Sequence, residues 1–482
     1  MNHRKVFNTV GLLFLVEGVL LLLPAVVGLV YREQQAMLGF LIAAAVTAAL
    51  GGVLLSACRP KNQVIYAKDG FAIVSLAWIA MSAFSALAMV LSGDIPNYID
   101  AFFESVSGFT TTGASVLQTI EDKSHALQFW RCFSNWLGGM GVIVFMMAII
   151  SSVSDRSIHI MRAEMPGPTV GKLVPRTKDT AKILYLIYIV MTAVQLVFHL
   201  AGGMPFFESL LHTFATAGTG GFGVMNDSIA GYSTYHTVVI TVFMLIFGIN
   251  FNLFYLVLVG RVKTALKSSE LWCFLAIVLV SIGTISLNIL PAYGSFGGAL
   301  EDAAFQVASV ISTTGFSTAD YNLWPALSKA ILLILMFVGA CAGSTGGGLK
   351  VARVMILFKL IVRELRQMLH PRSVNSVRLE GKPVETATLN SVATYFVVYV
   401  ICIAVVFIAL CFEPVFDFET NFTAAVACFN NIGPGFGAVG PSSNFAAYSG
   451  FSKIVLSFAM LFGRLEIFPL ILAFSPTTWK KK

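Results

Sequence analysis

The chain carries little charge: only 11% of its 482 residues are Asp, Glu, Lys or Arg, against roughly 25% in an average soluble domain. A soluble fold of this size would lack the charge to cover its surface, so a soluble enzyme is excluded. Seven cysteines are too few for a disulfide scaffold, and 57% hydrophobic residues exclude a disordered chain. The seven histidines form neither HxxxH nor HExxH, so no metal site of that kind is expected. What remains is a polytopic membrane protein.

Ten apolar segments are long enough to cross a membrane, which takes about 20 residues. They lie near 8–31, 36–57, 70–92, 127–153, 181–202, 235–260, 271–292, 326–366, 389–412 and 450–474. The first follows a basic start, but it is itself long enough to span. We therefore expect a retained helix rather than a cleaved signal. An even number of spans places both termini on one side.

The basic residues divide unevenly between the two sets of loops. Loops on the side of the termini hold 25 of the 31 lysines and arginines, including the basic loops at 154–180 and 366–388. The positive-inside rule therefore makes both termini cytoplasmic. The net charge of +7 reflects this topology and contact with anionic lipid, and it indicates neither an anionic substrate nor a nucleic acid partner.

The acidic residues gather in the opposite, outward-facing connections. They are Asp94, Asp100, Glu104, Glu121, Asp122, Glu208, Asp227, Glu301, Asp302, Asp320, Glu413, Asp417 and Glu419. A negative outer vestibule concentrates cations and repels anions.

Four outward connections share one order of features: a short apolar stretch, a glycine-rich polar stretch, then a spanning helix. These segments are 101–116, 206–224, 303–319 and 421–440, and their aligned glycines are Gly113, Gly221, Gly315 and Gly433. Irregular backbone at membrane depth is tolerated only where it is buried or lines water. Glycine lets carbonyl oxygens turn toward a common axis, where a ring of carbonyls can replace the water shell of a cation. The alternative is that these glycines only permit close helix packing.

Six motifs carry a family resemblance. They are GFTTTGAS (108–115), TGGFG (219–223), STTGFS (312–317), NNIGPGFG (430–437), ACAGSTGGGLK (340–350) and GRLEI (463–467). With these motifs the whole chain resembles the Trk/Ktr/HKT superfamily of potassium transporters, and within it the bacterial TrkH/TrkI type.

The resemblance implies an all-α polytopic membrane protein, in which four pseudo-fourfold helix–pore loop–helix repeats surround one central pore and two further helices precede them. The implied units are the N-terminal helix pair 1–68, repeat 1 at 69–155, repeat 2 at 156–262, repeat 3 at 263–368 with a gating loop at 339–350, and repeat 4 at 369–482.

The resemblance also implies where the transported K⁺ binds. The implied site residues are Thr111, Thr112, Gly113, Thr219, Gly220, Gly221, Thr313, Thr314, Gly315, Asn431, Ile432 and Gly433. In the second loop Gly218 competes with Gly221 for the key position. The fourth loop has Asn-Asn-Ile-Gly-Pro in place of Thr-Thr-Gly, which leaves its alignment open.

The segment 326–366 is too long for one span, because as a continuous helix it would extend about 61 Å. Glycines interrupt it near its middle, and the residues implied in gating are Gly343, Gly346, Gly347, Gly348 and Lys350. In the resembled family this break is an intramembrane loop that gates the pore, and Lys350 would hold it through hydrogen bonds or a carboxylate. The alternative is a kink without a gating role.

Arg464 lies inside the last span, where a charge costs at least ~2.5 kcal/mol on insertion scales and must face protein or water. In the resembled family the matching arginine places a positive charge in the pore, below the residues that bind K⁺, and slows the passage of cations. The alternative is that Arg464 snorkels or pairs with a carboxylate for assembly. Glu466, two residues on, is expected to face elsewhere.

Three functions are weighed against these features. The first is a channel-like potassium uptake protein of the bacterial inner membrane. The second is a symporter coupling potassium to protons or sodium, for which Glu17 and Glu466 are the intramembrane carboxylates. The third, a membrane enzyme, would need paired carboxylates or histidines near a membrane face. The resemblance also implies a homodimer with a cytosolic, nucleotide-binding TrkA-type subunit that regulates in trans.

Overall fold

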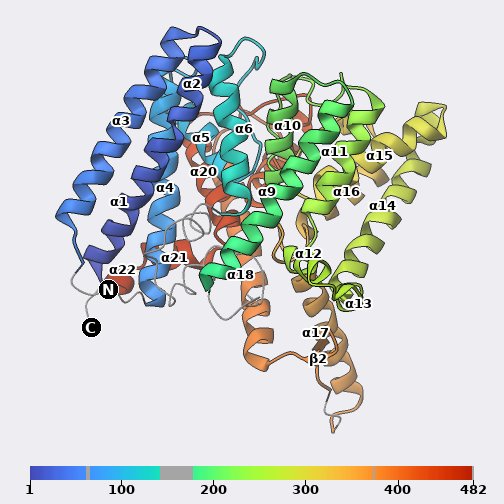
Figure 1. Cartoon of the computed structure of the whole chain (residues 1–482). Helices are drawn as coiled ribbons and strands as arrows, with labels where there is room; N and C mark the ends of the chain where they lie inside the picture. The colour runs from blue at the N-terminus through green and yellow to red at the C-terminus, as the bar shows by residue number, and fades with distance from the viewer. Residues whose placement is uncertain (61–65, 142–176, 373–374, 480–482) are drawn as a thin grey trace.

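A computed structural model describes residues 1–60, 66–141, 177–372 and 375–479, and within these ranges it is almost entirely helical (Figure 1). Two helical segments, α1 (His3–Leu20) and α2 (Leu22–Val30), form one span and precede α3 (Gln34–Ala57). The prediction of an all-α fold with apolar spanning helices is confirmed.

After α3 the described chain passes four times through a long helix, a shorter one and a further helical segment. The long helices are α4 (Ala67–Leu91), α9 (Thr177–Ala201), α14 (Ser269–Tyr293) and α18 (Thr386–Cys411). The shorter ones, here called half-helices, are α5 (Tyr98–Phe109), α10 (Phe206–Gly218), α15 (Phe296–Ile311) and α19 (Phe418–Phe429). The second segments are α6 (His125–Gly139), α11 with α12 (Thr234–Phe247, Phe251–Leu258), α16 with α17 (Ala326–Val338, Val351–Leu369) and α20 with α21 (Gly450–Arg464, Phe468–Phe474).

Short elements complete the described chain. They are α13 (Val262–Ala265), the 3₁₀ turns η1 (Tyr321–Leu323) and η2 (Gly437–Val439), α22 (Pro476–Trp479) and a hairpin of β1 (Arg378–Leu379) and β2 (Lys382–Pro383). In Figure 1 the hairpin lies beside α17, whose Lys359 donates to the Arg378 carbonyl, while α1 to α3 and α14 lie at opposite edges of the helical body.

Six helices in the described ranges are apolar and long enough to span, and two bent pairs raise that number to eight. The bent pairs correct the sequence analysis, which expected continuous spans at 235–260 and 450–474. The chain turns by 90° between α11 and α12 and by 120° between α20 and α21. At the second bend Glu466 and Ile467 both have positive φ angles, which a continuous helix does not allow.

The interruption expected within 326–366 is confirmed, because α16 ends at Val338 and α17 begins at Val351. The span expected at 127–153 is described only as far as residue 141. Most of its second half and most of the basic loop at 154–180 lie outside the described residues.

Both ends of the described chain lie at the same end of the molecule. The ring of His3 stacks on that of Trp479, with centroids 5.9 Å apart, and Figure 1 places the N-terminus beside α22. This agrees with an even number of membrane crossings.

Glycines bring α1 and α3 together at backbone distance. A Cβ atom on Gly11 would lie 2.7 Å from the Cβ of Leu54, and one on Gly51 would lie 2.7 Å from the carbonyl oxygen of Gly11. Small residues that permit such contact are a common basis of helix association in membranes.

Replacing Gly51 by leucine should therefore force α1 and α3 apart, and overpacking of this kind costs roughly 1–3 kcal/mol. The adjacent Gly52 is the matched control, because its Cβ position has nothing within 4 Å. We expect Gly51→Leu to lower the melting temperature of the detergent-purified protein and Gly52→Leu to leave it unchanged. Equal melting temperatures for the two variants would contradict the close packing.

Candidate functional site

Each half-helix ends in the same backbone motif. A residue just past its last turn has a left-handed φ between 54° and 59°; the four residues are Thr111, Thr219, Thr313 and Asn431. The next amide then donates to a carbonyl five positions earlier, at 2.8–2.9 Å; these donors are Thr112, Gly220, Thr314 and Ile432. This is the Schellman cap, here built on threonine or asparagine rather than the usual glycine.

The four loops that follow these caps, called here the central loops (110–116, 219–224, 312–319 and 430–437), touch one another in a closed ring. A Cβ on Gly113 would lie 2.2 Å from the oxygen of Gly220 in the second loop. A Cβ placed on each of the other three glycines would be similarly close to a carbonyl oxygen of the next loop. The distances are 2.0 Å for Gly221 and Thr314 O, 2.0 Å for Gly315 and Ile432 O, and 2.6 Å for Gly433 and Thr112 O. Each glycine thus leaves room for a carbonyl of the next loop, and the fourth contact returns to the first loop.

The ring also aligns the two loops whose alignment the sequence leaves open. Gly221, with φ +67°, occupies the ring position, whereas Gly218 ends α10 and lies against the backbone of Asn135. In the fourth loop Asn431, Ile432 and Gly433 repeat the backbone conformation of Thr313, Thr314 and Gly315 despite their different side chains.

The ring is suited to a dehydrated cation. The carbonyl oxygens of Thr112, Gly220, Thr314 and Ile432 lie where neighbouring loops meet, and the C-terminal ends of four half-helices approach the same centre. These ends carry partial negative charge, which adds to that of the carbonyls. Because the oxygens belong to the main chain, no acidic side chain is needed to attract the ion.

A cavity of about 80 Å³ opens on one face of the ring. It is lined by all four ring glycines and by Arg131. Glu104, expected in the exposed acidic vestibule, is instead fully buried, and its carboxylate accepts a hydrogen bond from Arg131 Nε at 2.7 Å. The vestibule prediction is therefore wrong for this residue, because an arginine that the sequence does not place beside it neutralises it.

On the opposite face the loop 339–350 lies against the ends of α15 and α19. The Gly347 amide donates to Thr313 Oγ1 at 2.6 Å, and a Cβ on Gly347 would lie 2.3 Å from the carbonyl oxygen of Asn430. A Cβ on Gly346 would lie 2.7 Å from Ser312 O. Gly346 and Gly347, two of the glycines expected in this loop, thus allow it to lie in direct contact with the third and fourth central loops.

Buried polar groups hold this loop in place. One carboxylate oxygen of Glu270, at the start of α14, accepts hydrogen bonds from the amides of Ala342 at 2.7 Å and Ala352 at 3.2 Å. The Lys350 ammonium donates to the carbonyl of Gly346. Gly343 and Gly348 both have φ +70°, and the Gly343 carbonyl accepts from the amide of Phe251.

Arg464 contacts the same loop and joins three parts of the chain. Its guanidinium donates to the carbonyls of Thr345 at 2.7 Å, Gly138 at 2.5 Å and Gly139 at 2.7 Å. It thus links α20 to the loop 339–350 and to the C-terminal end of α6. A cation at a helix C-terminus interacts favourably with the helix dipole, which offsets part of the cost of burying this charge.

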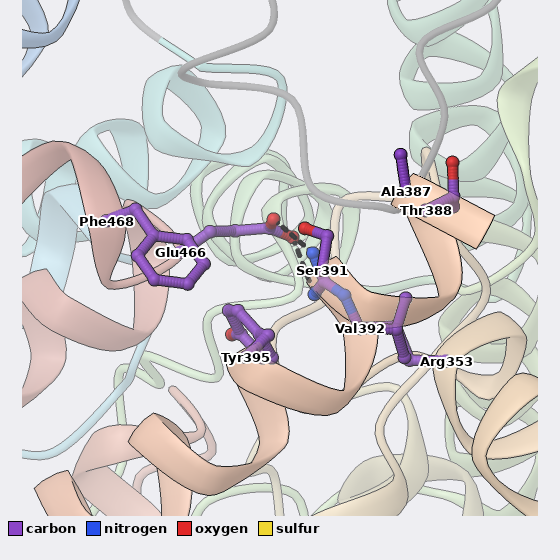
Figure 2. A pocket seen from close by; sticks show the side chains of 8 residues that line it. All are labelled: Arg353, Ala387, Thr388, Ser391, Val392, Tyr395, Glu466 and Phe468. Atoms are coloured by element: carbon purple, nitrogen blue, oxygen red, sulfur yellow. Dashed lines mark hydrogen bonds and ion pairs between the residues drawn. The ribbon is translucent and has the colours of Figure 1, made fainter. Parts of the chain in front are cut away.

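An ion pair connects the bend between α20 and α21 to α17. Glu466 forms an ion pair with both terminal nitrogens of Arg353, whose guanidinium also lies 4.0 Å from the centre of the Tyr395 ring. Figure 2 shows these side chains along one wall of a pocket of about 360 Å³. Glu466 thus contacts a different part of the chain from Arg464, in line with the expectation that the two side chains face different ways.

The sequence analysis missed Glu270 and the pairings of Arg353 with Glu466 and of Arg131 with Glu104. Glu270 stands among polar residues at the start of α14, where nothing in the sequence distinguishes it from an ordinary interfacial group. The one signal available was the position of Glu104 in the middle of a half-helix, directly after Phe102 and Phe103, since a buried charge requires a partner.

Comparison with known proteins places these features in context. The sequence model of the TrkH family, described as cation transport protein, matches residues 36–290 and 275–481. The chain is 38% identical to the Trk system potassium uptake protein TrkH of Salmonella typhimurium over the full length of both, and 33% identical to TrkG of Escherichia coli over 99% of each. The crystal structure of the potassium transporter TrkH from Vibrio parahaemolyticus superposes with a TM-score of 0.90, at 32% identity and full coverage of both chains.

Proposed function

The chain belongs to the TrkH family of cation transport proteins, and we propose that it takes up potassium through a selective, channel-like pore at the centre of the four central loops. The single observation that carries this proposal is the closed ring of glycine–carbonyl contacts. The relatives named as potassium uptake proteins support potassium as the ion. The residues that would bind it are Thr111, Thr112, Gly113, Thr219, Gly220, Gly221, Thr313, Thr314, Gly315, Asn431, Ile432 and Gly433.

The loop 339–350 is the gate in this proposal. It lies against two central loops, and it is held by hydrogen bonds that a small movement can break. Gly343, Gly346, Gly347 and Gly348 permit its close approach, while Lys350 and Arg464 hold it. Opening would require the loop to leave the ring together with the start of α17.

The wider setting follows the same proposal. The protein lies in the bacterial inner membrane as four repeats after a helix pair, with both termini cytoplasmic. It acts as a homodimer with a cytosolic TrkA-type nucleotide-binding subunit that moves the gate. The basic bias of the loops on the side of the termini supports this orientation.

A proton- or sodium-coupled symporter is the competing function. It requires an intramembrane carboxylate that is free to exchange its cation, but Glu466 is bound to Arg353. Glu17 is buried in α1, outside the four helix–half-helix units. The pairing of Glu466 therefore favours the uncoupled pore.

Rubidium uptake into proteoliposomes distinguishes these functions. We expect uptake driven by an inside-negative potential alone, with potassium competing far better than sodium. An absolute requirement for a proton or sodium gradient would establish the symporter, and absence of uptake in protein that remains monodisperse would refute both.

The ring glycines should control selectivity. A serine at Gly315 would place its Cβ 2.0 Å from the Ile432 oxygen and would force a side chain into φ +87°. We expect Gly315→Ser to lower the potassium-to-sodium uptake ratio roughly tenfold or more, because small displacements of coordinating atoms are costly. The control is Gly298→Ser in the same half-helix, where the nearest atom is 3.6 Å away. An unchanged ratio in Gly315→Ser would remove Gly315 from the binding site.

Arg464 should slow conduction for two reasons. It places a positive charge on the pathway, and its hydrogen bond to Thr345 holds the loop 339–350 in place. We expect Arg464→Ala to raise the initial rate of rubidium uptake at least a few-fold. Arg464→Lys separates the two effects: it keeps the charge, but one ammonium cannot reproduce the contacts of a guanidinium with three carbonyls. Arg363→Ala on α17, where the side chain is 26% exposed, serves as control. An unaltered rate in folded Arg464→Ala protein would exclude Arg464 from the pathway.

A further inference from the structure

The first and second central loops are joined by a buried ion pair. Arg131 on α6 is 1% exposed and Glu104 on α5 is 0% exposed, and their contact of 2.7 Å is one of several. The same carboxylate accepts from the Ser115 hydroxyl at 2.9 Å and, through its other oxygen, from the Val116 amide at 3.0 Å. The carboxylate therefore fixes the first loop just after Gly113.

The guanidinium extends this network to the second loop. One terminal nitrogen of Arg131 donates to the Gly223 carbonyl at 3.4 Å, and the other to the Ser115 hydroxyl at 3.3 Å. Its central carbon also lies 4.2 Å from the centre of the Phe222 ring. Phe222 directly follows the ring glycine Gly221, so a single side chain spans the contact between Gly113 and the carbonyl of Gly220.

The next two contacts between central loops are supported by hydrogen bonds between neutral groups. Between the second and third loops, the Ser317 amide donates to Ser228 Oγ at 3.2 Å. Between the third repeat and the fourth loop, the Asn322 side chain exchanges two hydrogen bonds with the backbone of Gly437. At the fourth loop Lys329 of α16 also lies 5.5 Å from the centre of the Phe436 ring and pairs with Glu419.

The fourth contact is supported by backbone and by a more exposed ion pair. The Phe445 amide donates to the Ser115 carbonyl at 2.8 Å, and Lys453 pairs with Asp100, which is 26% exposed. The Arg131–Glu104 pair is therefore the one ion pair, among the described residues, that directly contacts two central loops.

Half-helix positions equivalent to Glu104 show that this charge is specific to the first repeat. The residues nine positions before the other ring glycines are His212, Gln306 and Ala424. In addition, Arg131 lines the cavity above the ring. Its charge thus stands at the ion's entrance and would oppose entry if Glu104 did not balance it.

We propose that Arg131 is a positioning residue that determines ion selectivity by fixing the spacing of the first and second central loops, and that Glu104 both orients it and cancels its charge at the pore entrance. This inference rests on the proposed pore. Arg131 fixes the spacing of the loops and Glu104 balances its charge, and different variants can test these two roles separately.

The test is rubidium uptake into proteoliposomes, measuring KM and the rubidium-to-sodium ratio. Glu104→Gln leaves an unbalanced guanidinium, so we expect KM to rise roughly tenfold, and more at low ionic strength, where screening is weaker. Arg131→Lys keeps the charge but loses the fork of donors, so we expect a near-normal KM and a ratio lowered roughly tenfold. The doubly neutral Glu104→Gln/Arg131→Met variant, which avoids an unpaired buried charge, should restore KM but not the ratio.

Arg363→Gln is the control, because it breaks the ion pair with Glu364 on α17, which supports no contact of the ring, and it should leave the ratio unchanged. The proposal is overturned if Arg131→Lys and the double variant, both monodisperse, retain the wild-type ratio, or if Glu104→Gln retains the wild-type KM at low ionic strength. Failure of the wild-type protein to take up rubidium selectively would instead refute the proposed pore.

Discussion

The arrangement of the molecule depends on four stretches of irregular backbone that meet in one closed ring. A backbone carbonyl can approach a neighbouring chain this closely only where that chain has no Cβ, and Gly113, Gly221, Gly315 and Gly433 meet this requirement in turn. The half-helices then follow from the bilayer. Their backbone groups are satisfied internally until the last turn, so unsatisfied carbonyls are confined to the one place where an ion can use them.

The face of the ring toward the loop 339–350 is supported by backbone carbonyls and cationic side chains. Arg464 binds carbonyls from α6 and from this loop, while Lys350 binds a carbonyl within it. The acceptors of these two cations are neutral, while the buried Glu270 carboxylate accepts from the amides of Ala342 and Ala352. The loop is therefore held by charge-assisted hydrogen bonds from several elements, which are stronger than bonds between neutral groups.

Much of the fold was predictable, because its signals are local. The half-helices before Gly113 and Gly315 stand out as apolar stretches too short to span, and the glycines of 339–350 indicate the break between α16 and α17. The bends after Phe247 and Arg464 escaped prediction, although Gly248, Asn250 and Pro469 stand close to them, because each whole segment is apolar over a spanning length. The ring position of Gly221 also required the structure, because choosing it over Gly218 depends on the carbonyl of the neighbouring loop.

The two faces of the ring differ in how they are made rigid, and this difference follows from charge. On the cavity face Arg131 is neutralised by Glu104, and the pair stands in fixed contact with Ser115 and the second loop. On the other face the ion pair of Arg353 with Glu466 joins α17 to the bend after α20, one step removed from the ring. The spacing of the first and second central loops thus depends on the Arg131–Glu104 ion pair, which is costly to break. The opposite loop is held instead by charge-assisted hydrogen bonds between Arg464, Lys350 or Glu270 and neutral backbone groups.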